Sequence, residues 1–442
     1  MLIGGCFGGR FQGGVIESGM APQLARYQAV VFSCLFIGYA FYILCRKTFG
    51  FIIPIFVETE GLAKEDVGKV VSALNLAYAI SKFIIGVLSD QISARTLFFL
   101  GLTLSGASVV GFSRAGSVST YTLLWFVNGL SQGCGWPACA KVLRQWFKPS
   151  QFGTVWSLLS ASVNVTGAVV PLILPFLLAV GNGWRGFMLI SGVASIASAV
   201  VALIAVRNTP KDYGLPEIVA ESKKKDDKKS AGGQSDAKWP ALMQSSFLWR
   251  LSFYYFVVFA AKTSIENWAQ LLVLEEKQLS SALASGVISS FELGGMLSSF
   301  STGYITDWVL ARQAPNPKAT NPRMKVVMGY MLASVLALGL IASSNAFLPV
   351  LSFVLGASLY GNINIFGIVA TEEAPVHLSG SSHAVVSLAA NVGAVLAGYP
   401  FSVLATATSL TFAFYLEAFF CLVCLAALVL TKSSSTKIAH VD

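Results

Sequence analysis

GVLSDQISAR, at residues 86–95, is matched by GYITDWVLAR, at residues 303–312, and this repeat indicates how the chain folds. In both stretches an aspartate follows a glycine by four residues and precedes an arginine by five. Each stretch also follows the second apolar run of its half of the chain. We therefore expect two pseudo-symmetric halves, each containing the same series of helices.

The composition is that of a membrane protein. The 442 residues are 55% hydrophobic and 12% charged, with a mean hydropathy of +0.69, whereas soluble domains carry about 25% charged residues. A spanning helix needs about 20 mostly apolar residues, so we predict an all-α polytopic protein with twelve transmembrane helices. The expected spans are 28–56, 68–89, 96–113, 120–143, 152–180, 184–206, 247–273, 281–306, 324–344, 347–371, 379–405 and 409–431.

The polar segments divide the chain into five parts. The stretch ESKKKDDKKSAGGQSDAKWP, at residues 221–240, cannot bury a core and indicates a flexible linker. Short loops on the linker side are richer in Lys and Arg, which places both termini and the linker in the cytosol. We expect an N-terminal tail at 1–26, a six-helix half at 27–206, the linker at 207–246, a six-helix half at 247–431 and a C-terminal tail at 432–442.

Several functional classes are excluded. The net charge of +9 comes from cations in short loops, not from one soluble face, which argues against nucleic acid as a partner. Cys421 and Cys424 have a CxxC spacing, but no histidine or further cysteine lies near them in sequence. We expect no metal, no cofactor and no enzymatic activity, because no nucleophile and base are paired. The bilayer itself is the expected environment.

Basic residues inside the spans are the strongest functional signal. Arg46, Lys82 and Lys262 each lie in an apolar run, where a charge costs about 2.5–3.5 kcal/mol on insertion scales. Arg46 and Lys262 stand at nearly equivalent places in the first helix of each half, so they would face each other and repel. A phosphate monoester between them would remove the repulsion and make exchange obligatory. Lys47 lies nearer the span end and can snorkel.

Two alternatives stay open for the charged residues. Glu266 lies one helical turn after Lys262, so these two residues can form an ion pair instead. The repeated stretches place Asp90 with Arg95 and Asp307 with Arg312. These pairs are either gating contacts or simple loop salt bridges.

Neutral polar side chains in the spans are candidates for contacts with the rest of the substrate. Each of them can equally act in helix–helix contacts. The candidates are Tyr39, Tyr78, Asn164, Trp268, Asn362, Asn364, His383 and Asn391.

Five stretches carry a resemblance to a known family. They are RKTFGFIIP at 46–54, AYAISKFIIGVLSDQISAR at 77–95, NGLSQGCGWPACAKVLRQWFKPSQFGT at 128–154, VVFAAKTSIENW at 257–268 and SHAVVSLAANVGAVLAGYPFS at 382–402. The twelve spans in two halves resemble the major facilitator superfamily, which binds its substrate near the midplane. The stretches resemble its organophosphate:phosphate antiporter family, and most closely the glucose-6-phosphate translocase branch of the eukaryotic endoplasmic reticulum.

The resemblance implies an antiporter in the endoplasmic-reticulum membrane that exchanges glucose 6-phosphate for inorganic phosphate, working with a lumenal phosphatase. It implies that Arg46, Lys262 and Lys82 bind the phosphate. Val163 replaces the histidine of the bacterial glycerol-phosphate carrier, and Asn267 replaces the usual acid before the span 7 tryptophan. The alternatives are another sugar or triose phosphate as substrate, or a membrane sensor on the same fold.

Overall fold

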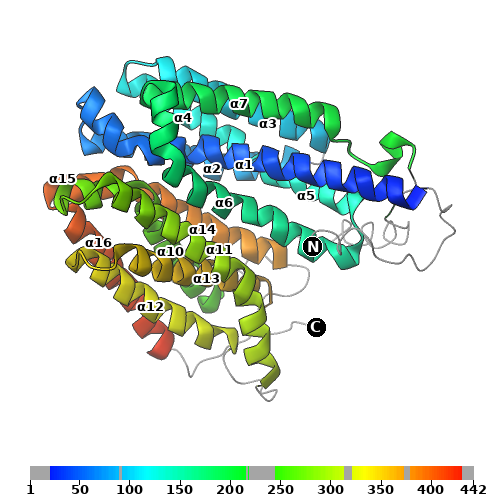
Figure 1. Ribbon diagram of the computed structural model, residues 1–442. Helices are drawn as coiled ribbons and strands as arrows, with labels where there is room; N and C mark the ends of the chain where they lie inside the picture. Colours follow the sequence, from blue (N-terminus) through cyan, green and yellow to red (C-terminus); the bar gives the residue numbers. More distant parts are fainter. Residues whose placement is uncertain are drawn as a thin grey trace. The chain divides into compact units, whose positions relative to one another are not determined.

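A computed structural model describes residues 20–88, 92–215, 218, 244–312, 321–372 and 379–430 (Figure 1). Within these ranges the chain is helical and contains no β-strand. The all-α fold class expected from composition is therefore confirmed. Both predicted tails, except the start of the first helix, and most of the predicted linker lie outside the described residues.

The first half of the chain supplies the helices of the first six predicted spans. The fourth span is interrupted at Gly133 and Cys134, so it appears as two helices, α4 and α5. A short 3-10 turn, η1 (Pro210–Tyr213), follows the sixth span. The α-helices are α1 (Met20–Glu60), α2 (Lys64–Leu88), α3 (Ala94–Arg114), α4 (Val118–Gln132), α5 (Gly135–Trp146), α6 (Pro149–Gly181) and α7 (Trp184–Ala205).

The second half supplies the other six spans. The eleventh span is interrupted at Ala397 and Gly398, which separates α14 from α15. A π-helical turn, η3 (Leu272–Glu276), ends the seventh span. The α-helices are α10 (Ser246–Leu271), α11 (Ser281–Arg312), α12 (Arg323–Ser343), α13 (Leu348–Glu372), α14 (Ser379–Leu396), α15 (Tyr399–Ala407) and α16 (Leu410–Leu430).

Eight described segments are long and apolar enough to cross a bilayer. They comprise α1, α3, α6, α7, α12, α13, α16 and the α14–α15 segment. The other predicted spans, α2, α10, α11 and the α4–α5 pair, either carry charged residues or are interrupted. The order of the helices agrees with the twelve predicted spans.

Two compact units divide the chain, and their boundaries differ from those expected from sequence. Unit 1 comprises Met1–Thr48, Ala77–Thr166 and Leu178–Asp227, and unit 2 comprises Phe49–Leu76, Gly167–Leu177 and Lys228–Asp442. Only the described residues of each unit are considered below. One end of α1, one end of α2 and part of α6 thus pack with second-half helices in unit 2. The boundaries at 206 and 247 remain a prediction.

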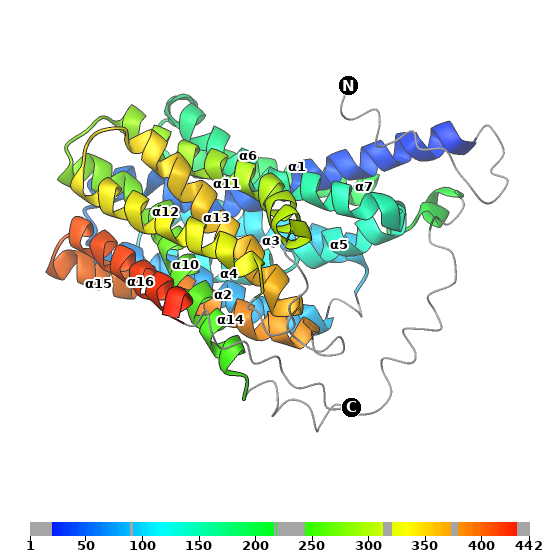
Figure 2. The same ribbon diagram turned by 90° about the horizontal axis from the view of Figure 1, so that it is seen from below.

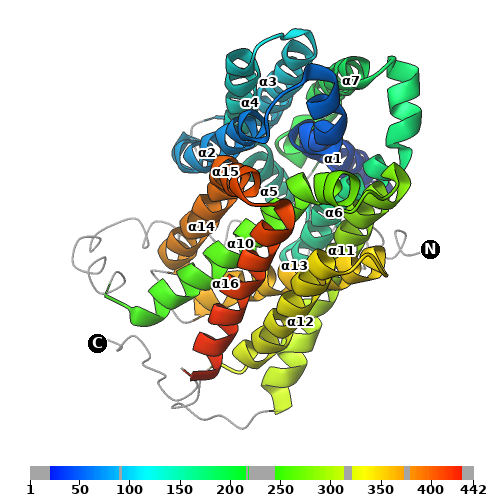
Figure 3. The ribbon, with the colours of Figure 1, turned by 90° about the vertical axis from the view of Figure 1, so that its left-hand side faces the viewer.

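Each unit has its own helix pairs. In unit 1, α3 packs along α7 and also contacts α4. In unit 2, the pairs are α11 with α13, α10 with α14, and α12 with both α13 and α16. Figure 2 shows α12 beside α13, and Figure 3 shows α12 beside α16 and α10 beside α14.

Within unit 2, the first turns of α2 contact the segment between α14 and α15. The Ser72 hydroxyl donates to the Val395 carbonyl oxygen at 2.8 Å and accepts from the Tyr399 N–H at 2.7 Å. Lys64 forms an ion pair with Glu275 of η3 at 2.8 Å. These contacts join segments that lie about 200 to 330 residues apart in the chain.

Candidate functional site

Two cations in unit 1 share one aromatic ring. The Arg46 guanidinium of α1 lies 5.3 Å from the centre of the Tyr78 ring, and the Lys82 ammonium lies 4.3 Å from the same ring. Tyr78 and Lys82 are one turn apart on α2, so they face the same side of the helix. Three of the residues predicted from sequence, Arg46, Tyr78 and Lys82, are therefore brought together.

An aromatic group lies one to two turns before Arg46 on α1. Tyr39 is 8% exposed, and its ring centre is 5.2 Å from that of Trp136 in α5. Trp136 in turn packs edge-on against Trp156 of α6, at 4.6 Å. Tyr39 therefore belongs to a packed aromatic cluster of unit 1. Whether it also contacts a substrate remains a prediction.

Amides of α4 hold the backbone of α1 beside Arg46. The Asn128 amide donates to the Cys45 carbonyl oxygen at 3.4 Å, and the Gln132 amide donates to the Tyr42 carbonyl oxygen at 3.1 Å. Asn128 and Gln132 are 0% and 6% exposed. Buried amide contacts of this kind fix the position of a helix. They therefore fix the backbone position from which the Arg46 side chain extends.

The basic residue of unit 2 has a carboxylate partner. The Lys262 ammonium lies 2.8 Å from Oε2 of Glu266, and the two side chains are 7% and 14% exposed. The ammonium also lies over the Tyr360 ring, 5.1 Å from its centre. The pairing with Glu266 that the sequence left open is thus formed in this structure, because a carboxylate four residues away on the same helix face reaches Lys262. Binding of phosphate by Lys262 remains a prediction.

Tyr360 of α13, to which the sequence pattern assigned no role, lies between two carboxyl groups. Its hydroxyl lies 3.1 Å from Oε2 of Glu292 in α11 and 3.5 Å from Oε1 of Glu266. Glu292 is fully buried, at 0% exposure. Nothing local to Tyr360 in the sequence pointed to its position between two carboxyl groups.

The side chains of Asn267 and Trp268 already make hydrogen bonds in this structure. The Asn267 amide donates to the Thr263 carbonyl oxygen at 2.7 Å on its own helix. Trp268 is fully buried, and its indole N–H donates to the Ala397 carbonyl oxygen at 2.8 Å. Because indole has one donor, Trp268 holds the break between α14 and α15 and offers no donor to a sugar here.

The other polar candidates differ in exposure. Asn362 and Asn391 of unit 2 are 0% and 5% exposed, and neither amide atom of Asn362 has a hydrogen-bond partner in the described structure. His383 is exposed and lies 3.3 Å from the Ser387 hydroxyl. Asn364 is half-buried, and Asn164 of unit 1 is 4% exposed. Their roles as substrate contacts remain predictions.

Of each predicted gating pair, the structure describes only the side chain of the arginine. Asp90 lies outside the described residues, and the side chain of Asp307 is not described. Arg95 donates from Nε to the Leu203 carbonyl oxygen at 2.6 Å, at the end of α7. Arg312 lies over the ring of Trp308, at 3.7 Å. Arg95 is near the start of α3 whereas Arg312 is the last residue of α11, so the two arginines differ in structural position.

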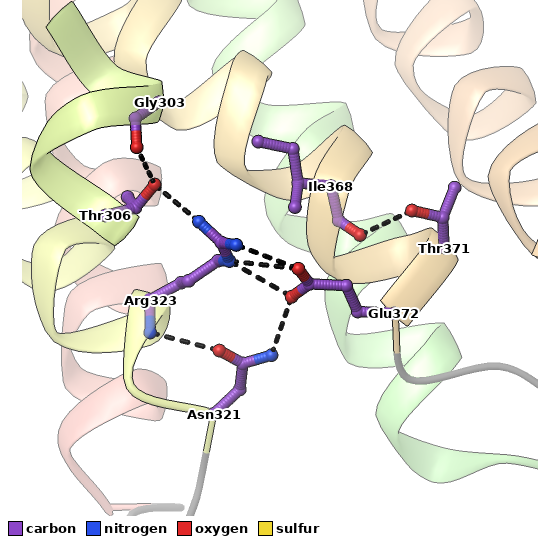
Figure 4. Close-up of polar contacts among 7 residues, drawn as sticks. All are labelled: Gly303, Thr306, Asn321, Arg323, Ile368, Thr371 and Glu372. Atoms are coloured by element: carbon purple, nitrogen blue, oxygen red, sulfur yellow. Dashed lines mark hydrogen bonds and ion pairs between the residues drawn. The ribbon is translucent and has the colours of Figure 1, made fainter. Parts of the chain in front are cut away.

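Arg323, at the first position of α12, joins three helices of unit 2 (Figure 4). Its Nη2 lies 2.9 Å from Oε1 of Glu372 at the end of α13, and its Nε lies 3.0 Å from Oε2. Its Nη1 donates to the Thr306 hydroxyl of α11 at 2.6 Å. Asn321 closes the group by donating to Glu372 at 3.3 Å. Its partner Glu372 lies 49 residues away in the sequence, so nothing local to Arg323 indicates this group.

No group of three or more potential metal ligands occurs in the described part of the chain. Both cysteines of the CxxC spacing, Cys421 and Cys424, are buried and form no disulfide. What the described groups offer is two cations on a ring in unit 1 and a lysine with two carboxyl groups in unit 2. Such groups bind anions and protons.

Comparison with known proteins gives one family. The sequence model of the Major Facilitator Superfamily matches residues 35–398. The "Probable hexose phosphate transport protein" of Chlamydia pneumoniae is 31% identical over 389 residues, covering 84% of this chain and 83% of that protein. The "Membrane sensor protein UhpC" of Escherichia coli is 26% identical, covering 83% of both chains. The "Glycerol-3-phosphate transporter" of Bacillus subtilis is 27% identical, with the same coverage.

Solved structures agree with this fold. A bacterial homologue of the human lysosomal transporter Spinster, in an inward-facing and unoccupied conformation, has a TM-score of 0.70 and 13% identity. The match covers 92% of this chain and 95% of that one. At this identity the similarity concerns the fold alone.

Proposed function

Because the chain belongs to the Major Facilitator Superfamily, we propose that it exchanges glucose 6-phosphate for inorganic phosphate by alternating access. Transport of a sugar phosphate is supported by relatives named for hexose-phosphate and glycerol-3-phosphate transport. The choice of glucose 6-phosphate and the exchange for phosphate rest on the sequence resemblance. A triose phosphate or another sugar phosphate is the alternative substrate.

The placement of Arg46 and Lys82 on one Tyr78 ring is the observation that carries the proposal. Two like charges this close stabilise an anion between them, and a phosphate ester brings about −1.5 to −2 charges and three acceptor oxygens. The Arg46 guanidinium can bind two of these oxygens at once. Lys82 supplies a second, mobile charge.

In our proposal Lys262 is the cation that the second half contributes to the same phosphate. Its pairing with Glu266 means that the phosphate has to displace a carboxylate to reach it. The repulsion between Arg46 and Lys262 that would enforce exchange is correspondingly reduced in the empty carrier. Obligatory exchange is therefore a hypothesis to be measured.

The sugar is proposed to be recognised by the polar groups of spans 10 and 11. His383, Asn364 and Asn391 lie on α13 and α14, and His383 lies beside Gly367 of α13. If they contact the hexose, substitutions there should reduce glucose 6-phosphate transport more than phosphate–phosphate exchange. A parallel loss of both activities would assign them to helix packing.

The cellular setting is a further part of the proposal. The resemblance suggests the endoplasmic-reticulum membrane, cytosolic termini and a lumenal phosphatase that consumes the transported ester. The curated relatives reported above are bacterial and say nothing of this organelle. Imaging of a tagged chain, with protease protection of each terminus, tests both points.

Counterflow in proteoliposomes tests the function directly. Vesicles preloaded with phosphate receive a panel of labelled sugar phosphates, and we expect glucose 6-phosphate to accumulate most strongly. Efflux into buffer with and without external phosphate then measures how strictly influx and efflux are coupled. Accumulation of none of the panel would contradict the transporter assignment.

A sensor is the second candidate, because one relative is named as a membrane sensor. A sensor would bind sugar phosphate without moving it. The same vesicles separate the two functions, since binding without counterflow would favour the sensor.

A further inference from the structure

The end of α4 lies between the two helices that carry the cations of unit 1. Asn128 and Gln132 are one turn apart on α4, and their amides donate to carbonyl oxygens of α1. Leu130 and Gly133 lie on the other side of α4 and meet Ser81 of α2. The last turn of α4 and its C-cap therefore contact both α1 and α2.

The contact with α1 is made at the turn that carries Arg46. The Gln132 amide donates to the Tyr42 carbonyl oxygen at 3.1 Å. In a continuous helix the Arg46 N–H donates to this same oxygen, four residues back. The Asn128 amide donates to the carbonyl oxygen of Cys45, the residue directly before Arg46, at 3.4 Å. Both amides thus contact the backbone that carries the Arg46 side chain.

The contact with α2 is made next to Lys82. The hydroxyl of Ser81, the residue directly before Lys82, donates to the Leu130 carbonyl oxygen. A continuous helix would direct the Cys134 N–H to this oxygen. Span 4 is interrupted here, and the Cys134 N–H donates to the Ser131 carbonyl oxygen instead, at 3.1 Å. The interruption therefore makes the Leu130 carbonyl oxygen available to Ser81.

α2 and the interruption in span 4 are also packed closely. Ser81 is 2% exposed, and a Cβ atom at Gly133 would lie 2.8 Å from the Ser81 Cβ and 3.0 Å from its carbonyl carbon. Glycine permits this close approach of two helices. A larger side chain at residue 133 would have to displace α2 or α4.

α3 holds the two amides of α4 in place. Gln132 also donates to the Ser105 hydroxyl at 2.8 Å, and Asn128 also donates to the Ser108 hydroxyl at 3.0 Å. Both amides are buried. A buried and connected network of hydrogen bonds is rigid, so the end of α4 is a fixed support for its two neighbours.

We propose that the end of α4 sets the spacing between Arg46 and Lys82 and thereby determines how tightly the phosphate group is bound. Gln132 and Ser81 are positioning residues, because they act through the two cations. The inference rests on the proposed function, since it requires that both cations bind one phosphate. Binding groups have to be held within about 0.5 Å of the productive geometry, so a shift of α1 or α2 lowers the affinity.

Phosphate binding by the purified full chain measures the effect of the spacing. Calorimetry with inorganic phosphate gives the Kd, and the melting temperature of the same samples reports stability. For Gln132→Leu and Ser81→Ala we expect the Kd to rise about tenfold, as for a cation that loses roughly one net hydrogen bond to its ligand. Gly133→Ala should raise the Kd at least as much, because the added methyl group displaces α2.

Counterflow separates positioning from a structural role. The same variants should raise the half-saturating concentrations of glucose 6-phosphate and of phosphate by the same factor, because the two substrates share the phosphate group. A merely structural role would lower the maximal rate through loss of folded protein and leave both half-saturating concentrations unchanged.

Gln28→Leu is the matched control. Gln28 is 7% exposed and Gln132 is 6% exposed. The Gln28 amide also joins two helices of unit 1, since it donates to the carbonyl oxygen of Trp146 at 2.6 Å. It is far from Arg46, about 27 Å along α1 at 1.5 Å per residue. The control should lower the melting temperature without changing the Kd for phosphate.

The outcomes separate the two proposals. A wild-type Kd in Gln132→Leu, Ser81→Ala and Gly133→Ala overturns the positioning role and leaves the transporter assignment intact. An equal rise of the Kd in Gln28→Leu also overturns it, because the effect would then not depend on the end of α4. If Gln132→Leu does not fold, the smaller change Ser81→Ala decides. Absence of phosphate binding by the wild type would instead contradict the proposed function.

Discussion

Tyr78 lies beside two cations inside a predicted span. Arg46 and Lys82 both lie within about 5 Å of its ring, where each cation–π contact contributes about 0.5–2 kcal/mol. The ring lowers the cost of holding two cations together.

Replacement of Arg46 by lysine tests whether geometry or charge alone binds the phosphate. Lysine keeps the charge but loses the planar fork, and a charge-assisted hydrogen bond contributes about 1.5–3 kcal/mol. We expect exchange to fall by about one to two orders of magnitude at normal protein levels. Arg207→Lys is the matched control, because Arg207 lies over the Tyr213 ring outside the candidate site, and exchange should fall much less.

Counterflow of labelled phosphate in vesicles of equal protein content provides the measurement. Near-normal exchange by Arg46→Lys and Arg46→Ala would remove Arg46 from the proposed phosphate site.

At this scale the sequence revealed the charges, and it revealed a partner only where the two residues lie on the same helix. Arg46, Lys82 and Lys262 stood out because a charge in an apolar span is costly. The Lys262–Glu266 pair could be anticipated because both residues lie on one helix face. Tyr360 could not be assigned, because its two partners come from α10 and α11, and helix packing alone decides that meeting.

The close approach of α11 and α13 in unit 2 positions Tyr360 beside Glu292. A Cβ at Gly356 of α13 would lie 1.9 Å from the Phe291 carbonyl oxygen, and one at Gly294 of α11 would lie 2.0 Å from that of Phe353. The two backbones are therefore in direct contact, as small residues permit in membrane helices. This approach brings Tyr360 to Glu292.

Gly356→Ala should separate α11 from α13. A methyl group has no room against a backbone oxygen, so we expect a loss of about 1–3 kcal/mol in stability and a lower melting temperature in detergent. Gly339→Ala on α12 is the control, because no atom lies within 4 Å of that position. It should leave stability unchanged or raise it by up to about 1 kcal/mol. Equal melting temperatures for the two variants would contradict the contact.

The connection between α10 and α11 holds the ends of two other helices. Glu276 accepts from the backbone N–H and hydroxyl of Thr411, at 2.9 and 2.7 Å, at the start of α16. Lys277 donates to the carbonyl oxygens of Ala342 and Ser344, at 3.2 and 2.8 Å, at the end of α12. Each charge has the sign that stabilises the helix end it touches.

Acid should weaken the contact made by Glu276. Partial burial raises the pKa of Glu276, but the hydrogen bonds from Thr411 and Leu410 outweigh it, so the net pKa is lowered. A lowered folded-state pKa means that the stabilisation is present above the unfolded pKa of about 4.3 and is lost as pH falls through the folded value.

Melting temperatures of the wild type and Glu276→Gln, measured from pH 7 to pH 3, should converge on acidification. Glu275→Gln is the control, because its ion pair with Lys64 is partly exposed and contributes little. A constant difference between wild type and Glu276→Gln across this range would show that the carboxylate charge is unimportant.

Over the whole molecule, the contacts between α2 and α15 join the first and second halves of the sequence within unit 2. A Cβ at Gly68 would lie 2.8 Å from the Ser402 Cβ. Disulfides prefer about 3.5–4.5 Å between Cβ atoms, so a slight separation would admit one. Alternating access requires such contacts between halves to form and break in each cycle.

Gly68→Cys combined with Ser402→Cys should lock this contact. Oxidation is expected to stop counterflow almost completely, and a reductant should restore it. Each single cysteine variant, treated with the same oxidant, controls for effects on native thiols. Full exchange by the oxidised double variant, with cross-linking verified, would show that this contact stays closed throughout transport.

The fold was predictable at this scale because the bilayer restricts the possibilities. Only helices and closed β-barrels satisfy their backbone groups in lipid, and the long continuous apolar runs are typical of helices. The runs therefore indicated the number, order and approximate bounds of the spans. The interruptions at Gly133 and Gly398 were not predicted, because the flanking runs are apolar on both sides. The division into compact units differed from the repeat, since the ends of α1 and α2 pack with distant helices.

The neighbouring residues Glu276 and Lys277 also show that order along the chain carries information that composition does not. Exchanging the two would leave mass, net charge and hydropathy unchanged. Each charge would then meet the helix end that repels it, and two helices would lose their electrostatic anchors through one transposition. Such an exchange would change no bulk property of the protein, but it would change the stability of the fold.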